Sequence, residues 1–189
     1  MKKFFVLAVL LFSVSAFADP AVLGRFECYK TDGSKTNCAL VFEKNQYALD
    51  FYFIKSVVDT RSGGLVLMPE KYFQKFAGAF GKFLEWCKIA EETGAVLDKD
   101  IPKEFEFMYA FKLSWAPVVH GTLKYKATTI DGVRYLQVYE SSADEYYLDN
   151  MLFTEEQAKV FYDFMMSDKC DFKYLKKNWK KLIEEDPFK

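Results

Sequence analysis

The segment SSADEYYLDN places three carboxylates, Asp144, Glu145 and Asp149, around Tyr146 and Tyr147. Glycosidases use a pair of carboxylates, and tyrosine rings can stack on sugars, so these residues are candidates for glycan binding or hydrolysis. Loop carboxylates also suit calcium, but the D-x-D-x-D-G spacing of an EF-hand loop is missing. The simpler alternative is an acidic surface loop, because carboxylates are mostly exposed.

Two further side chains are of types that occur in functional sites. Arg61, in the expected loop DTRSGG, is the best single candidate for binding an anion, and the alternative is a solvated loop arginine. His120 is the single histidine and falls in the expected turn APVVHG. A catalytic histidine needs an orienting acid and a nucleophile, and no G-x-S-x-G elbow exists. We therefore expect a solvated turn histidine and no catalytic set.

The first eighteen residues, MKKFFVLAVLLFSVSAFA, have the three parts of a secretory signal peptide. Two lysines precede an apolar run, and a small-x-small site ends at Ala18. The apolar run is too short for the alternative, a transmembrane anchor. We expect cleavage after Ala18, and a single domain over residues 19–189 in the periplasm or outside the cell.

Charge then excludes one class of partner. Removing residues 1–18 takes away two of the 26 Lys and Arg and none of the 27 Asp and Glu, which leaves a side-chain charge of −3. Nucleic-acid binding depends on a basic footprint, so we expect no nucleic acid. No later stretch approaches the length of a membrane span, and we expect no transmembrane segment.

The cysteines predict two disulfides. An even number of cysteines in an exported chain indicates pairing, and of the three possible pairings we expect Cys28–Cys38 and Cys87–Cys170. Cys28 and Cys38 are equidistant from Gly33 in an expected hairpin, and directly opposed positions suit a disulfide. With no C-x-x-C pair and one histidine, we expect no metal site and no cofactor.

Hydrophobic patterns predict an α+β fold in which antiparallel sheets are covered by helices. Alternation and turn residues such as Asp131-Gly132 predict strands at 22–30, 37–44, 46–55, 65–68, 104–113, 122–129, 133–140 and 146–153. Pro69 and Thr93-Gly94 bound an expected helix over 69–92. Thr154 and Gln157 form a capping box for a second helix over 154–166, and 171–185 is a further amphipathic segment.

The stretch LVLMPEKYFQKFAGAF, residues 65–80, begins a stripe of aromatic residues at helical spacing. A buried face against a sheet is the main interpretation, and an apolar ligand pocket is the alternative. Gly78 and Gly81 lower helix propensity, which predicts close approach of another backbone.

The order of expected elements suggests a duplicated ββββα unit, with pseudo-repeats 22–93 and 104–170. A shift of 85 residues aligns residues 65–80 with NMLFTEEQAKVFYDFM. This order is similar to that of the Whirly and PC4-like folds, which bind single-stranded nucleic acid. The resemblance covers element order alone, and export and net acidity argue against a shared activity.

These observations favour an exported bacterial protein of the cell envelope that acts by binding. The expected partner is an envelope protein or a small apolar or glycan ligand, and the alternative function is a carboxylate-dependent glycan hydrolase. Lysines on 171–185 could place that segment on an anionic membrane surface. Packing of its apolar stripe on the sheet is the favoured interpretation.

Overall fold

The computed structural model describes residues 21–43, 46–51, 64–112, 119–141 and 150–184, and the following refers to these residues. Its strands are β1 (Ala21–Lys30), β2 (Lys35–Glu43), β3 (Gln46–Phe51), β4 (Gly64–Met68), β5 (Asp98–Asp100), β6 (Phe107–Lys112), β7 (Val119–Ile130), β8 (Val133–Ser141) and β9 (Met151–Thr154). Its helices are α1 (Glu70–Thr93), α2 (Glu155–Met165) and α3 (Phe172–Glu184), with short 3-10 turns η1 (Lys103–Phe105) and η2 (Asp168–Cys170). The expected signal peptide and cleavage site lie outside these residues.

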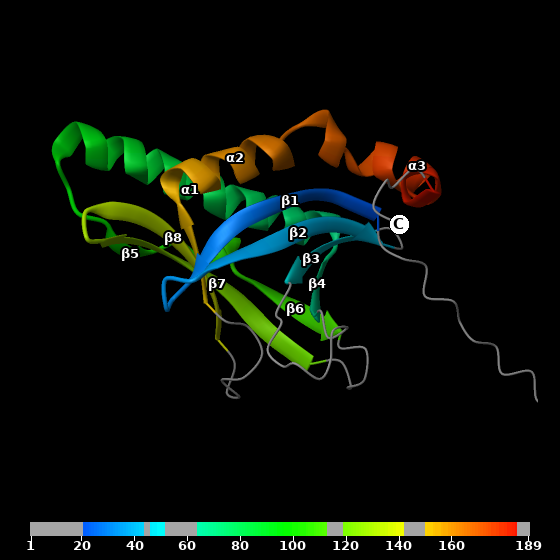
Figure 1. Ribbon diagram of the computed structural model, residues 1–189, viewed down its shortest axis with the longest axis horizontal. Coiled ribbons are helices and arrows are strands. Elements are labelled where there is room, and N and C mark those ends of the chain that lie inside the picture. Colours follow the sequence, from blue (N-terminus) through cyan, green and yellow to red (C-terminus); the bar gives the residue numbers. More distant parts are fainter. Residues whose placement is uncertain (1–20, 44–45, 52–63, 113–118, 142–149, 185–189) are drawn as a thin grey trace, which may run out of the picture.

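The strands form one antiparallel sheet, in the order β5-β7-β6-β4-β3-β2-β1-β9-β8. Because β7 also pairs with β8, every strand except β5 belongs to a closed ring. The three helices lie together over one side of the strands (Figure 1). The α+β class is therefore confirmed, whereas the duplication of a ββββα unit is not confirmed and stays a prediction.

Helix α1 follows its sequence signals closely. Pro69 occupies the N-cap position, and the helix ends at Thr93 because Gly94 adopts a left-handed conformation with φ of 70°. Its aromatic stripe is buried as expected, which confirms the main interpretation of residues 65–80. The expectation that another backbone approaches the helix glycines closely was wrong. A Cβ at Gly78 would lie 2.6 Å from the ring of Phe105, so a side chain rather than a backbone requires the glycine.

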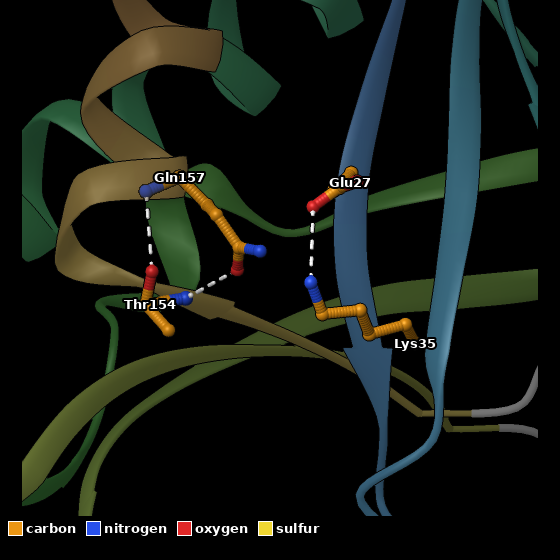
Figure 2. A network of polar contacts seen from close by, with 4 residues as sticks. All are labelled: Glu27, Lys35, Thr154 and Gln157. Atoms are coloured by element: carbon orange, nitrogen blue, oxygen red, sulfur yellow. Dashed lines mark hydrogen bonds and ion pairs between the residues drawn. The ribbon is translucent and has the colours of Figure 1, made fainter.

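Helix α2 starts at the expected capping box. The Thr154 hydroxyl accepts from the Gln157 N–H at 3.2 Å, and the Gln157 side chain accepts from the Thr154 N–H at 3.0 Å (Figure 2). Two N–H groups that the helix cannot pair are thereby satisfied. The box fixes where β9 ends and α2 turns back over the sheet.

One apolar core joins the sheet to the helices. Its centre is a group of phenylalanine rings from β1, α1, β9 and α2: Phe26, Phe76, Phe80, Phe153 and Phe161. Helix α3 adds Leu175, which is 1% exposed, and the partly buried Phe172 and Leu182. This contact agrees with the interpretation in which 171–185 packs on the sheet. Among the described helices, none has the length and hydrophobicity of a membrane-spanning segment.

The predicted disulfides were wrong. The β1–β2 turn is centred on Asp32, one residue earlier than expected, so Cys28 lies opposite Thr36 and Cys38 lies opposite Phe26. The two cysteines are diagonal neighbours, and diagonal positions are too far apart for a disulfide. Cys87 and Cys170 are not at bonding distance either, and all four cysteines are buried in the apolar core.

We expect the thiols to be unreactive in the folded protein. Burial, with a smaller contribution from Glu155, raises the pKa of Cys87 to about 12, and burial raises that of Cys170 to about 12. Iodoacetamide at pH 8 should leave the folded chain unlabelled and should alkylate all its cysteines after unfolding without a reductant. A peptide map under the same conditions that shows 28 linked to 38, or 87 linked to 170, would contradict the structure.

Candidate functional site

The structure does not test the site residues predicted from the sequence. Arg61, Asp144, Glu145, Tyr146 and Tyr147 lie outside the described residues, as does Asp149. His120 belongs to β7, where it pairs with Ala110 of β6, because the strand begins at Val119. The expectation of a turn at that position was therefore wrong.

An open groove lies where the first half of α1 meets the end of α2, the η2 turn and the start of α3. Its volume is about 450 Å³, within the range of ligand-binding clefts. The sheet contributes Tyr47 to it, and the helices and turns contribute the other lining residues: Glu70, Phe73, Gln74, Ala77, Gly78, Tyr162, Met165, Met166, Ser167, Asp168, Cys170, Asp171 and Phe172.

Tyr47 is buried at the base of the groove. Its ring stacks on Phe73, with ring centroids 3.8 Å apart, and its hydroxyl donates to the carbonyl oxygen of Cys170 at 2.6 Å. Burial, then electrostatic interaction with Cys170, Glu70 and Asp171, raises the pKa of the Tyr47 phenol far above its ordinary value. Tyr47 thus stays neutral and ties β3 to α1 and to η2.

Three carboxylates surround this base because three helical segments begin at the groove. Glu70 lies in the first turn of α1, Asp168 begins η2, and Asp171 caps α3 by accepting from the Tyr174 N–H at 2.6 Å. All three are exposed. Each carboxylate carries a full negative charge, whereas a helix N-terminus supplies only about half a positive charge. The rim therefore remains negative.

Three of the lysines close to the groove in sequence have other partners. The Lys71 ammonium lies over the Tyr72 ring at 4.7 Å, and the Lys169 ammonium lies over the Phe164 ring at 6.0 Å. Lys75 donates to the Glu106 carbonyl oxygen at 3.0 Å. Ion pairs among the described residues do not include the three rim carboxylates. The lining of the groove includes no lysine or arginine, so the groove combines an apolar base with a rim of carboxylates that form no ion pair among the described residues. We call it the acidic groove.

A second hollow, of about 470 Å³, lies between β1 and the start of α2. It contains both acidic and basic side chains. Three of its polar side chains already have partners within the chain (Figure 2): Glu27 lies 3.7 Å from Lys35, and Thr154 and Gln157 bind each other in the capping box. It is a weaker candidate, because a ligand would compete with these contacts.

Among the residues that the structure describes, no cluster of three or more His, Cys, Asp or Glu is placed to hold a metal ion. The groove's lining includes no histidine, and its two nucleophilic side chains are held within the chain: the Ser167 hydroxyl donates to the Phe164 carbonyl oxygen at 2.7 Å, and Cys170 is buried with its pKa raised to about 12. Comparisons of the chain with protein-family models, with curated proteins and with solved structures found no match.

Proposed function

We propose that this is an exported bacterial protein that binds a polypeptide partner in the acidic groove. The observation that carries the proposal is an open groove whose base is aromatic and whose rim carries three carboxylates with no ion-pair partner among the described residues. Export is supported by the signal-peptide pattern of residues 1–18.

A polypeptide suits this groove better than a small molecule does. The groove is open on its solvent side and lies between helices, an arrangement that accepts helical segments of partner proteins. Met166 beside it is 63% exposed, and flexible thioether side chains are frequent on surfaces that accommodate a partner. The alternative of a glycan hydrolase centred on Asp144, Glu145 and Asp149 depends on residues outside the described ranges and stays a prediction.

Filling the groove should abolish binding without harming the fold. Gln74 is exposed and lines the groove, so Gln74→Trp would place an indole where the partner binds. Native mass spectrometry of protein purified from its own cells should show a retained partner for the unmodified chain. Gln74→Trp should lose it, whereas Glu91→Trp, on the exposed surface of the last turns of α1, should keep it. Equal retention by both variants would place the binding surface elsewhere.

A further inference from the structure

The exposed side of α3 carries lysines, which are absent from the lining of the acidic groove. Lys173 and Lys177 are one helical turn apart and are exposed, and Tyr174 between them is 53% exposed. The α3 residues on the other side, including Leu175, pack into the core. We call this surface of two lysines and a tyrosine the basic face. Its aromatic ring is not part of the apolar core, so packing within the chain does not explain it.

The acidic groove and the basic face are contiguous. Asp171 belongs to the rim of the groove and also caps α3, and the next residue, Phe172, lines the groove as the first residue of the helix. Lys173 follows directly. One side of the molecule therefore carries an acidic, aromatic-based hollow beside a basic helix with a projecting aromatic ring.

Two neighbouring surfaces of opposite charge are self-complementary under a two-fold rotation. In such an arrangement the first surface of each copy meets the second surface of the other, and the contact closes without leaving either surface unused. The same pair of surfaces in a head-to-tail contact would instead grow into a fibre. A two-fold pair satisfies both surfaces in a closed assembly.

We propose that the polypeptide bound in the acidic groove is the basic face of α3 from a second copy of this chain, in a two-fold dimer. This inference rests on the proposed function and names its partner. Lys173 and Lys177 of each copy lie against Glu70 and Asp168 of the other, and Tyr174 enters the groove over its aromatic base. The dimer is electrostatic in part, so raising the salt concentration from about 0.05 M to about 0.5 M should weaken it on the order of tenfold.

Charge reversal on each surface, followed by mixing, tests the pairing. The variant E70K/D168K makes both surfaces basic, and K173E/K177E makes both surfaces acidic. Asp171 is left unchanged because it caps α3. Analytical ultracentrifugation should show that the unmodified chain dimerises and that each variant alone dimerises on the order of 100-fold more weakly, since like charges then face each other. An equimolar mixture of the two variants should recover the dimer.

Controls separate this result from a general effect of charge. E91K/E92K changes the net charge as much as E70K/D168K does, on exposed residues at the other end of α1, and should dimerise like the unmodified chain. Circular dichroism should be the same for every variant. An unmodified chain that stays monomeric up to about 300 µM would overturn the inference. So would variants that still dimerise alone, or a mixture that stays monomeric.

The inference can fail while the proposed function stands. A monomeric chain that retains a different polypeptide, and loses it in Gln74→Trp, would refute the dimer and support the groove as a binding surface. A monomeric chain whose retained partner is unaffected by Gln74→Trp would refute both.

Discussion

Replacing Phe161 with alanine should lower the free energy of unfolding by about 3–5 kcal/mol, the largest effect that we expect from a single substitution. Phe161 is fully buried and belongs to α2. Its ring centroid lies 4.1 Å from that of Phe26 in β1, 5.2 Å from that of Phe80 in α1 and 5.8 Å from that of Phe153 in β9. Truncation would leave a cavity at the point where the sheet and two helices meet.

The neighbouring residue provides a matched control. Val160 is on the same helix but is 58% exposed, so Val160→Ala should change the free energy of unfolding by no more than about 0.5 kcal/mol. Urea unfolding followed by circular dichroism measures both values. A loss below about 1 kcal/mol for Phe161→Ala would mean that α2 does not pack against the sheet as described.

Removing one hydroxyl from each of two buried tyrosines should have opposite effects. The Tyr47 hydroxyl donates to the Cys170 carbonyl oxygen, so Tyr47→Phe leaves a buried acceptor without that partner and should cost about 1–3 kcal/mol. The Tyr125 hydroxyl is fully buried and has no hydrogen-bond partner among the described residues. Tyr125→Phe removes an unsatisfied group and should be neutral or stabilising.

Urea unfolding at pH 7 distinguishes these outcomes, and each variant serves as the control for the other. Equal losses for both would contradict the described contacts. Alkaline pH adds a second readout. Burial raises the pKa of both phenols above their ordinary value of 10, so above pH 10 the unfolded chain loses protons that the folded chain keeps. Stability should therefore fall as pH rises above 10, and less steeply in Tyr47→Phe than in the unmodified chain.

Local signals in the sequence predicted the helices well. Pro69 and Gly94 bound α1 to within one residue of the expected range, and Thr154 with Gln157 fixed the start of α2, because caps act through neighbouring residues. The hairpin was less predictable. A one-residue difference in the centre of the Asp32-Gly33 turn changes which residues face each other, and that difference decided against the Cys28–Cys38 disulfide.

The elements after α1 show a similar limit. The alternation of apolar residues from Phe105 to Phe111 predicted one strand, whereas Pro102 begins the η1 turn and β6 starts only at Phe107. The short strand β5 was missed, because its sequence Asp-Lys-Asp has no apolar alternation and it is held by pairing with β7. Tertiary pairing overrides weak local preference in such segments.

The acidic groove could not be predicted from the sequence. Tyr47 and Cys170, which meet at its base, are 123 residues apart, and no local pattern connects them. Each rim carboxylate also lies at the start of a helical segment, as Glu70 does in the first turn of α1. Acidic residues are favourable at such positions for local reasons, so their presence in the sequence does not indicate a groove. One signal was available in MMSDKCDF, where adjacent methionines and Asp168 come directly before the basic segment 171–185, which itself begins with Asp171. Their significance follows only from the folding of α1 beside them.

Photo-cross-linking from position 74 tests most directly whether the acidic groove is the binding surface. A benzophenone amino acid at Gln74 places a reactive group in the groove, and the same group at Glu91 is the control on the distant end of α1. On irradiation in its own cells, the position 74 protein should give a discrete adduct with a polypeptide, and the position 91 protein should not. If position 74 gives no adduct, or if both positions give the same one, the acidic groove is not where this protein binds.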